Sequence, residues 1–354
     1  MNAREYDAII VGASFAGLTV ARELRGEVLL LDAHEVGSHQ ISACGTPLWV
    51  PEMFGVKESV IQVHTRAVIH TPTRTVTYDA SDSPYCTFEY RRFCRGLLDQ
   101  CRVRFLRTLV RGFVEGGVAT DAGRFEAACV IDASGWHRAI VGRGTPAAAA
   151  PPLSFGLETE ADYAGEALYF WIDPDILPEG AAWLFPVGAR SRIGLGSYAG
   201  ASRLRPRLER FLRGLDLSPT RFYGTYFPAG LGPPTVGRVF AVGDAAGQCL
   251  PLTGEGIRPA VYFGRICGGM VQSVIDGRRS LDAALEEYGV RVLAYRGAYR
   301  VLRALQWAVQ RVPRASLGPL AELGNLPAIR RRWWPRYLDF GKPSAWNGGQ
   351  PWAP

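Results

Sequence analysis

The segment DAIIVGASFAGLTVA, from Asp7 to Ala21, joins an apolar run to a glycine turn and a helical pattern. Residues 8–11 predict a buried strand, and the LTVAREL that follows the glycines has helical spacing. Gly12 would make the sharp turn, and Gly17 would let the helix pack closely on the strand. The helix start would then present N–H groups and the positive end of its dipole to a pyrophosphate. The segment therefore predicts the strand-turn-helix unit of a nucleotide-binding α/β domain.

Two further positions refine this prediction. Ser14 stands where the usual G-x-G-x-x-G pattern has its middle glycine, and its Cβ lies where a phosphate should approach most closely. EVLLLD predicts a second strand ending at Asp32, 20 residues after Gly12, which suits a ribose 2′-hydroxyl and would repel a 2′-phosphate. The segment thus favours FAD or NAD over NADP. A structural unit that binds no nucleotide is the alternative.

A second glycine-rich segment, RVFAVGDAAGQCLPLTGEG, runs from Arg238 to Gly256. Its apolar start predicts another buried strand, after which the Asp244 carboxylate could accept a hydrogen bond from a polyol hydroxyl. PLTGEGI, residues 251–257, predicts the start of a long helix, which could stabilise negative charge on a reduced flavin. NAD-binding domains do not need such a second segment. The two segments together therefore predict FAD, with a loop aspartate and structural glycines as the alternative.

These residues resemble the flavoprotein superfamily of p-hydroxybenzoate hydroxylase and, within it, the geranylgeranyl reductase family. VGDAAGQCLPLTGEGIRPA is similar to that family's GDAAG…PLTGEGI stretch. PEGAAWLFPVGARSRIGLG, residues 178–196, is similar to its Y-x-W-x-F-P-x7-G-x-G signature, with Ala181 in place of the tyrosine. Cys44 and Gly45 follow the second strand, where the family has a Cys-Gly pair near the flavin. The resemblance covers roughly residues 5–300.

The resemblance implies an α/β fold with a Rossmann-like FAD-binding domain of ββα three-layer type. It also implies an inserted antiparallel β-sheet substrate domain and a helical C-terminal region. We expect the FAD-binding domain at residues 1–150 and 233–280, the substrate domain at 151–232 and the C-terminal region at 281–354. PAAAAPP, residues 146–152, breaks both helix and strand and would mark the crossing between domains.

The implied activity is an FAD-dependent reductase that hydrogenates isolated C=C bonds of a geranylgeranyl-type chain on a lipid, quinone or pigment precursor. Hydride would come from N5 of reduced FAD. An unactivated alkene cannot stabilise negative charge, so a placed proton donor is needed. By the resemblance Cys44 lies near the flavin and is a candidate donor, with a buried inert cysteine as the alternative. His39, His64, His70 and Tyr226 also remain possible donors. The electron donor stays open between NAD(P)H, ferredoxin and reduced flavin.

Other flavin chemistries remain alternatives. An FAD-dependent monooxygenase or halogenase acting on an apolar substrate would share the predicted cofactor site. Flavin halogenases resemble a W-x-W-x-I-P pattern with a nearby functional lysine, whereas the lysines here are Lys57 and Lys342. A non-redox isoprenoid cyclase of the lycopene type is a further alternative.

The expected site residues form three sets. Cys44 and Gly45 are expected at the catalytic centre. Aromatic residues could line an apolar pocket for a hydrocarbon chain, although aromatic residues on strands are often core. The expected pocket residues are Trp183, Phe185, Pro186, Tyr169 and Trp171. The expected FAD contacts, in which Arg91 and the D-x-x-G residue Gly135 come from the resemblance, are Gly12, Ser14, Phe15, Ala16, Gly17, Asp32, Ala33, Arg91, Gly135, Gly243, Asp244, Pro251, Gly254, Glu255, Gly256 and Ile257.

Length and composition indicate the number of domains and the compartment of the protein. A chain of 354 residues predicts two coupled domains. Seven cysteines, an odd number with no C-x-x-C pair and no signal peptide, favour a reducing cytoplasm, and no metal site is indicated. The longest mainly apolar stretch, Ala8 to Ala21, is too short to span a membrane.

The C-terminal region carries most of the excess positive charge. Residues 291–354 hold ten arginines and Lys342 against Glu322 and Asp339. Five tryptophans lie among them, Trp307, Trp333, Trp334, Trp346 and Trp352. This combination suits an anionic bilayer surface, with a cytoplasmic protein peripheral on the inner membrane face; nucleic acid is not expected. A solvated arginine face with tryptophans packed inward is the alternative.

Overall fold

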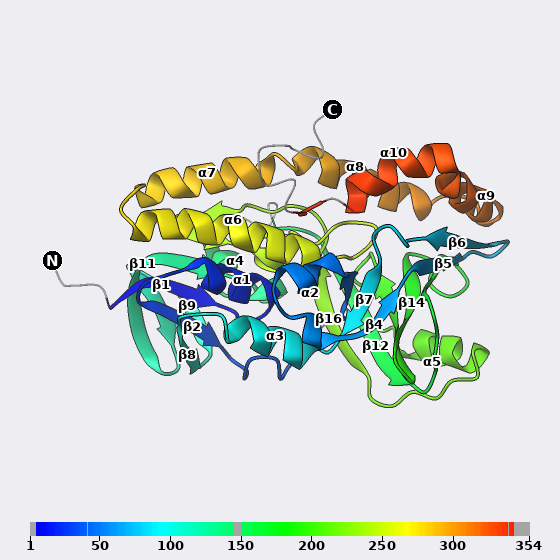
Figure 1. Cartoon of the computed structure of the whole chain (residues 1–354), viewed down its shortest axis with the longest axis horizontal. Coiled ribbons are helices and arrows are strands. Elements are labelled where there is room, and N and C mark those ends of the chain that lie inside the picture. Colours follow the sequence, from blue (N-terminus) through cyan, green and yellow to red (C-terminus); the bar gives the residue numbers. More distant parts are fainter. Residues whose placement is uncertain (1–4, 41, 145–149, 339, 343–354) are drawn as a thin grey trace. The chain divides into compact units, whose positions relative to one another are not determined.

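The computed structural model describes residues 5–40, 42–144, 150–338 and 340–342, which divide into two compact units (Figure 1). Unit 1 comprises the described parts of residues 1–40, 91–152 and 228–302. Unit 2 comprises those of residues 41–90, 153–227 and 303–354. Each unit is therefore assembled from three separate stretches of chain.

Unit 1 is built on a sheet in which the strands that carry the glycine-rich turns run parallel. The sheet order is β17-β18-β11-β1-β2-β8, with β17 antiparallel at one edge. The strands are β1 (Tyr6–Val11), β2 (Val28–Asp32), β8 (Arg104–Arg107), β11 (Gly123–Asp132), β17 (Thr235–Val236) and β18 (Val239–Ala241). Strands 1 and 2 are almost entirely buried, as expected for parallel strands covered on both faces.

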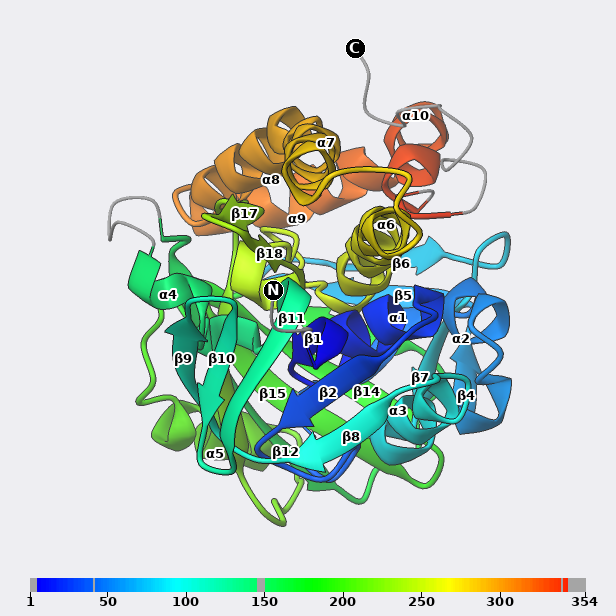
Figure 2. The ribbon, with the colours of Figure 1, turned by 90° about the vertical axis from the view of Figure 1, so that its left-hand side faces the viewer.

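Two layers cover this sheet. Helices α1 (Phe15–Glu23) and α6 (Ile257–Ile275) pack on one face, with α7 (Leu281–Leu293) stacked on α6 (Figure 2). The hairpin of β9 (Val110–Val114) and β10 (Gly117–Thr120) covers the other face and pairs with the first half of β11. Val110 and Val118 from this hairpin pack against Ile9 and Leu29 of the sheet. Unit 1 also contains α3 (Tyr90–Leu98), η2 (Gly135–His137), α4 (Val141–Gly144), η4 (Gly243–Ala246) and part of α8 (Arg296–Val309).

Unit 2 holds a larger, mostly antiparallel sheet and a small three-stranded one. The large sheet has the order β16-β12-β15-β14-β13-β5-β6, and the small one β3-β7-β4. Its strands are β3 (Gly45–Pro47), β4 (Val60–His64), β5 (Arg66–His70), β6 (Thr75–Asp79), β7 (Tyr85–Phe88), β12 (Leu153–Ala161), β13 (Leu168–Trp171), β14 (Gly180–Val187), β15 (Arg190–Ser197) and β16 (Tyr223–Pro228). Its helices are α2 (Trp49–Met53), η1 (Lys57–Ser59), α5 (Arg205–Gly214), α9 (Arg314–Asn325) and α10 (Pro327–Leu338).

The two faces of the large sheet differ in chemistry, because alternate residues on a strand point to opposite sides. On one face Leu184 and Ile193 form a core with Leu208 and Leu212 of α5. The other face carries the intervening residues of β12, β14 and β15, among them Trp183. We call this second face the signature face, since it bears the W, F and G-x-G positions of the reductase signature.

The fold class is confirmed, with a Rossmann-like parallel sheet, an antiparallel second sheet and a helical C-terminal region. The units differ from the expected boundaries in several places, and the described part of residues 303–354 groups with unit 2. Residues 41–90 group with unit 2, because β5 pairs in parallel with β13. Residues 281–302 group with unit 1, where α7 packs on α6. Strand alternation does not tell which sheet a strand will join. Residues 146–149 of PAAAAPP lie outside the described residues.

Candidate active site

The first glycine turn of unit 1 needs both of its glycines. Gly12 has φ +107°, and a Cβ there would lie 2.2 Å from the carbonyl oxygen of Ala133. A Cβ on Gly17 would lie 1.8 Å from the carbonyl oxygen of Gly12. A side chain at either position would collide with backbone, so the turn and the close packing of α1 follow from these two residues.

Asp32 closes the same turn from the end of β2. Its Oδ2 accepts the Ala13 N–H at 2.7 Å, and its Oδ1 accepts the His34 N–H at 2.8 Å. Each carboxylate oxygen can accept a second hydrogen bond. The residue can therefore brace the turn and still receive a ribose hydroxyl. Ala33 follows Asp32 and is exposed.

The second glycine-rich segment lies directly against the first. Gly243 has φ +65°, and a Cβ there would lie 2.8 Å from the Ala16 Cβ. A Cβ on Gly264 of α6 would lie 3.0 Å from the carbonyl oxygen of Ala16. The fold thus brings together two segments more than 200 residues apart, as a single cofactor site requires.

Two residues that sequence reasoning missed hold this second turn. The buried Gln248 accepts the Gly243 N–H through Oε1 at 2.6 Å. Tyr288 of α7 is also buried, and its hydroxyl donates to the Ala241 carbonyl at 2.8 Å. Gln248 lies within the recognised segment, but nothing in a single sequence distinguishes a buried amide that shapes a turn from an exposed one.

Asp244 has an unused carboxyl group. Surrounding protein raises the pKa of this carboxyl to about 7, although the residue keeps some exposure to solvent. Among the described residues no hydrogen bond to its carboxylate is found. A ligand hydroxyl would supply the missing donor, which fits the ribityl chain expected here.

The loop before α6 adopts a special backbone and uses its own acid internally. Leu252 and Gly254 have φ of +71° and +64°, and α6 begins at Ile257 with Gly256 as N-cap. Arg258, which is fully buried, donates to both oxygens of Glu255 at 2.8 and 2.6 Å. Glu255 is therefore engaged in a bidentate ion pair. Its neighbours Pro251 and Gly256 present the loop backbone at the helix start.

The remaining predicted cofactor contacts also lie in unit 1. Gly135 has φ +71° and begins η2. Asp132 of the same motif is buried and accepts the N–H groups of Ile140 and Val141, both at 2.9 Å, so its role is structural. Arg91 is exposed in the first turn of α3. Ser14 and Phe15 stand at the start of α1. These residues fit a dinucleotide that carries a flavin, and the Asp244 carboxylate is the clearest sign.

The signature face of unit 2 explains why the reductase signature pairs a tryptophan with G-x-G. A Cβ on Gly194 would lie 2.2 Å from Trp183 Cζ2, and one on Gly196 would lie 3.3 Å from Cζ3. A Cβ on Gly156 of β12 would lie 3.7 Å from Cη2 of the same indole. The indole therefore lies across a floor of glycines from two neighbouring strands.

The Cys-Gly pair meets this face through Phe185. A Cβ on Gly45 would lie 3.0 Å from Phe185 Cε2. The Phe185 ring in turn packs edge-on against Phe170, with centroids 5.3 Å apart. Two parts of the family resemblance that are 140 residues apart are thus in direct contact within unit 2.

Cys44 is fully buried and held by local hydrogen bonds. Its N–H donates to Ser42 Oγ at 3.1 Å, its Sγ donates to the Ser42 carbonyl at 3.2 Å, and its carbonyl accepts the Phe88 N–H at 3.1 Å. Its φ of +56° is unusual for a residue with a side chain. Burial raises the pKa of the thiol to about 12, against a lowering effect of Arg192. At neutral pH Cys44 is therefore a thiol that can give up a proton but is a weak nucleophile.

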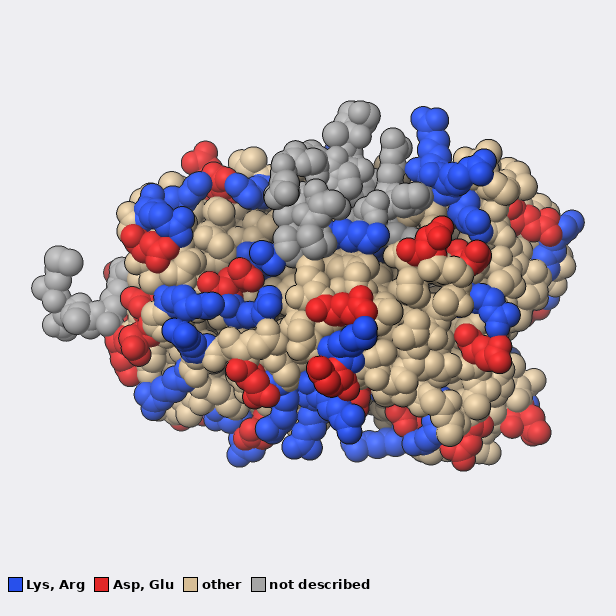
Figure 3. Space-filling model, viewed as in Figure 1, with Lys and Arg blue, Asp and Glu red and all other residues tan. Residues whose placement is uncertain are grey.

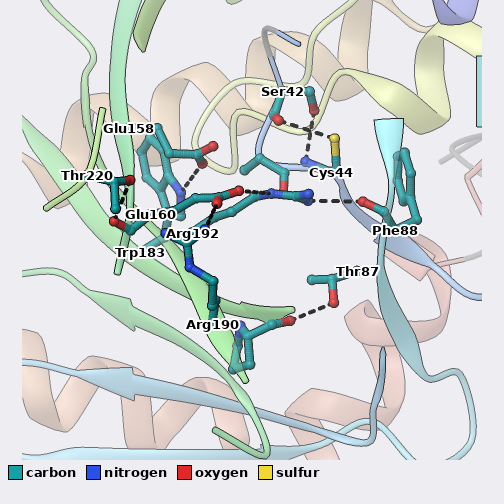
Figure 4. Close-up of polar contacts among 12 residues, drawn as sticks. Ser42, Cys44, Thr87, Phe88, Glu158, Glu160, Trp183, Arg190, Arg192 and Thr220 are labelled. Atoms are coloured by element: carbon teal, nitrogen blue, oxygen red, sulfur yellow. Dashed lines mark hydrogen bonds and ion pairs between the residues drawn. The ribbon is translucent and has the colours of Figure 1, made fainter. Parts of the chain in front are cut away.

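Arg192 and Glu158, which sequence reasoning missed, connect Cys44 to the signature face (Figure 4). The buried Arg192 donates through Nη1 to the carbonyls of Phe88 at 3.0 Å and Ala43 at 3.3 Å. Its Nε lies 3.6 Å from Glu160 Oε1, within ion-pair range but too far for a hydrogen bond. Trp183 Nε1 donates to Glu158 Oε2 at 2.9 Å. The period-2 spacing of these residues was the signal that could have placed them on one face.

The predicted pocket residues do not all come together. Trp183 and Phe185 share the signature face, whereas Tyr169 and Trp171 lie on the opposite face of the sheet. Trp171 packs edge-on against Phe211 of α5, with centroids 5.0 Å apart. Pro186 also alternates away from the signature face, and its carbonyl accepts the Thr87 hydroxyl at 2.6 Å. Trp183 and Phe185 therefore remain the candidates for substrate contact.

Comparison with known sequences points to one group of enzymes. No family model matches the sequence. The digeranylgeranylglycerophospholipid reductase of Methanocaldococcus jannaschii is 31% identical over 128 residues, 34% of this chain and 33% of the relative. Digeranylgeranylglycerophospholipid reductase 2 of Methanopyrus kandleri is 26% identical over 330 residues, 80% of this chain and 81% of the relative. The match thus spans about a third of the first relative and about four fifths of the second.

Comparison with solved structures shows the fold. A geranylgeranyl bacteriochlorophyll reductase-like protein from Thermoplasma acidophilum has a TM-score of 0.83 at 17% identity, covering 97% of this chain and 98% of that one. The p-nitrophenol 4-monooxygenase of Pseudomonas putida has a TM-score of 0.74 at 16% identity, covering 95% and 98%. The fold is thus shared with flavoenzymes of different chemistry, while the sequence relatives are reductases. In sequence the chain is therefore similar to digeranylgeranylglycerophospholipid reductases, and in fold it is similar to a geranylgeranyl reductase-like protein.

Proposed function

We propose that this protein is an FAD-dependent reductase that hydrogenates isolated C=C bonds of a prenyl chain carried by a lipid, quinone or pigment precursor. The observation that carries the proposal is the contact of the Cys44-Gly45 pair with the signature face through Phe185. The relatives named as digeranylgeranylglycerophospholipid reductases support an isoprenoid lipid as the substrate.

FAD is the proposed cofactor, and it would supply hydride to the substrate when bound. The turn at Gly12 and the start of α1 would hold the pyrophosphate, and Asp32 would receive the adenosine ribose. Asp244 would accept a hydrogen bond from the ribityl chain, for which its carboxylate is free of hydrogen bonds to described residues. These roles use backbone N–H groups and carboxylates that the structure has placed in one unit.

The chain's own residues would bind and orient the prenyl chain. Trp183 and Phe185 offer aromatic surface without a charged group, which suits a hydrocarbon that has no polar handle. Cys44 adds a buried thiol that stays protonated at neutral pH, since burial raises its pKa to about 12. Reduction of the alkene also needs a proton donor.

Anaerobic flavin reoxidation tests the proposed function. The purified FAD-loaded protein is reduced with one equivalent of dithionite and then mixed with a detergent-dispersed digeranylgeranyl glycerophospholipid. We expect the flavin to be reoxidised and the lipid mass to rise by two hydrogens for each flavin. Reoxidation that requires O₂ and yields a hydroxylated product would indicate a monooxygenase. A changed product without change of flavin redox state would indicate a cyclase.

We further propose that unit 2 binds an anionic membrane surface through α9 and α10. The inner side of α9 is anchored on β6: the Tyr78 hydroxyl donates to the Ala321 carbonyl at 2.6 Å, and Asn325 Nδ2 donates to the Thr77 carbonyl at 2.9 Å. Large apolar residues on these two helices nevertheless remain exposed. They form the α9–α10 patch, Leu320, Leu323, Leu326, Ile329 and Trp333.

Charge beside this patch favours an anionic surface over a neutral one. Arg331 and Arg332 are exposed on α10, and no ion pair is found for them among the described residues. Figure 3 shows Lys and Arg side chains gathered over the α10 end of unit 2. Exposed apolar side chains flanked by arginines are typical of helices that lie in a membrane interface. In the part of the chain that the structure covers, no helix combines the length and the apolar character needed to cross a bilayer.

Some tryptophans of this region are exposed, as a membrane-binding surface requires, and one packs inward, as the alternative predicts. Trp307 and Trp333 are exposed, at 59% and 37%. Trp334 instead packs on Tyr78, with ring centroids 6.1 Å apart. Trp346 and Trp352 lie outside the described residues.

Vesicle sedimentation tests the membrane proposal. We expect the protein to bind vesicles that contain phosphatidylserine and to bind pure phosphatidylcholine weakly, with salt reducing the difference. The double change Leu320→Ser and Leu323→Ser should weaken binding. Val63→Ser on β4, where Val63 is 46% exposed, is the matched control and should not. Equal binding of all three proteins would remove the patch from the proposal.

A further inference from the structure

Glu158 is a buried carboxyl group that has no role in the proposed binding of FAD or of the prenyl chain. It is 5% exposed on β12, and its Oε2 accepts the Trp183 indole N–H at 2.9 Å. Its Oε1 has no hydrogen-bond partner within 3.5 Å among the described residues, and the Tyr223 hydroxyl on β16 lies near enough to act on the carboxyl as a weak donor. A buried oxygen without a hydrogen-bond partner costs free energy. Such an oxygen therefore marks a place where a ligand, or a transferable proton on the carboxyl, is expected.

The neighbouring acid on the same strand face shows how different Glu158 is. Glu160 keeps 28% exposure of its side chain and lies 2.9 Å from Arg190 and 3.6 Å from Arg192. It is a surface acid with ion-pair partners. Glu158 has neither solvent nor an ion pair within 4 Å among the described residues.

The charged and titratable groups around Glu158 have opposing effects on its pKa. Burial raises the pKa of the carboxyl and dominates, while Arg192 on β15 lowers it. The Trp183 indole and the Tyr223 hydroxyl on β16 also lower it, and Glu160 raises it. The charges of Cys44 and Glu158 in turn raise the pKa of Arg192. Glu158 is therefore held as a neutral acid to higher pH than usual, next to a cation that can stabilise the anion it would become.

Glu158 is also the better acid of the two candidate donors on this face. The Cys44 thiol, with a pKa of about 12, gives up its proton reluctantly. Protonation of an unactivated alkene is the demanding half of the reaction, and a donor works best when its pKa lies near the working pH. A carboxylic acid that stays neutral by burial meets this requirement more closely than the thiol does.

We propose that Glu158 is the acid that protonates the double bond, and that Arg192 stabilises the carboxylate that remains. This rests on the proposed reductase function. One alkene carbon receives hydride from the reduced cofactor, which is oxidised by two electrons. The O–H bond of Glu158 breaks, and its proton forms the new C–H bond on the other carbon as the π bond is consumed. The carboxylate then takes a proton from solvent.

The central test is Glu158→Gln, with Glu160→Gln as its matched control. Glutamine keeps an oxygen for the Trp183 N–H but cannot release a proton. We expect single-turnover flavin reoxidation by the prenyl lipid to slow by about 10²–10⁴-fold in Glu158→Gln, with FAD still bound. Wild type and Glu160→Gln should both show a rate that falls as pH rises through the Glu158 pKa, at lower pH in Glu160→Gln because Glu160 raises that pKa. Glu158→Gln should lack that limb of the profile.

Cys44→Ala distinguishes the two donors. If Glu158 is the acid, Cys44→Ala keeps the falling limb of the pH profile even if its rate is lower. If the limb disappears in Cys44→Ala and persists in Glu158→Gln, Cys44 is the acid and the proposal is wrong. Wild-type rate and profile in Glu158→Gln would overturn it as well.

A measurement without cofactor or substrate separates this proposal from the reductase function. Infrared spectra recorded at pH values above the ordinary glutamate pKa of about 4.3 should show the C=O stretch of a protonated carboxyl that is missing in Glu158→Gln and present in Glu160→Gln. Absence of that band in wild type would overturn the role of Glu158 even if the protein reduces prenyl lipids. If the band is present but no prenyl lipid reoxidises the reduced flavin of the wild-type protein, the reductase function is wrong. The proposed protonation step is then wrong as well.

Discussion

The two units both bring distant glycines together, but the glycines serve different ends. In unit 1, Gly12 and Gly17 are required by backbone, since a Cβ on either would strike a carbonyl oxygen within about 2 Å. In unit 2, Gly194 and Gly45 make room for the Trp183 and Phe185 rings. A backbone requirement is local and has one solution, whereas room for a ring depends on which strands become neighbours. Changes to Gly12 or Gly17 should therefore displace backbone in unit 1, whereas changes to Gly194 or Gly45 should displace the aromatic rings of unit 2.

Removal of Arg192 should have the largest effect, because unit 2 depends on side chains where unit 1 depends on backbone. Arg192→Met leaves Glu158 without its nearby cation and frees the carbonyls of Ala43 and Phe88. Loss of one partner from a buried charge cluster costs about 3–5 kcal/mol. We expect a loss of this order in the free energy of unfolding by urea. Arg192→Lys should recover part of it, and equal stability of Met and Lys variants would show that the charge is unimportant.

Gly17→Ala should give the next largest effect, in unit 1. The added Cβ would lie 1.8 Å from the Gly12 carbonyl oxygen, so α1 must shift from β1. Such overpacking costs about 1–3 kcal/mol and should also reduce FAD retained on purification. The control is Gly269→Ala on α6, which is exposed and has nothing within 4 Å of the new Cβ. That change should be neutral or stabilising by up to about 1 kcal/mol.

Gly194→Ala should separate chemistry from cofactor binding. Its Cβ would lie 2.2 Å from Trp183 Cζ2, so the indole must leave its place and its bond to Glu158. We expect turnover of a prenyl lipid to fall by about tenfold or more with FAD occupancy unchanged. Gly196→Ala, with 3.3 Å to the same ring, should lose less. Equal losses in the two variants would contradict the glycine-floor interpretation.

The smallest effect concerns Asp244 and is a pH dependence. Its carboxyl has a pKa of about 7, and a ligand hydroxyl that donates to it favours the ionised form. FAD affinity should therefore rise as pH increases through about 7. Asp244→Asn should bind FAD with a few-fold lower affinity above that pH and with no such rise. Fluorescence titration of FAD at several pH values checks both expectations. A wild-type affinity that does not change with pH would contradict the role of Asp244 in FAD binding.

Much of unit 1 could be predicted from the sequence, and less of unit 2. The strand-turn-helix at Gly12 and the strand ending at Asp32 appear where the pattern placed them. Of the aromatic residues predicted to line one pocket, Trp183 and Phe185 share the signature face. Tyr169 and Trp171 instead alternate to the face that packs on α5. Period-2 alternation separates the two faces of a strand, but it does not tell which of them is the core.

The sequence by itself determined the fold class and the glycine turns of unit 1, because a turn with positive φ or a helix pressed on a strand restricts the residue at that very position. The tertiary structure alone decided that residues 41–90 join unit 2 and that the indole of Trp183 lies on the glycines of its neighbouring strands. It also decided that Glu158 stands beside Arg192. Those relations depend on strand pairing between distant segments, and the burial that changes the chemistry of a carboxyl exists only once the strands have met.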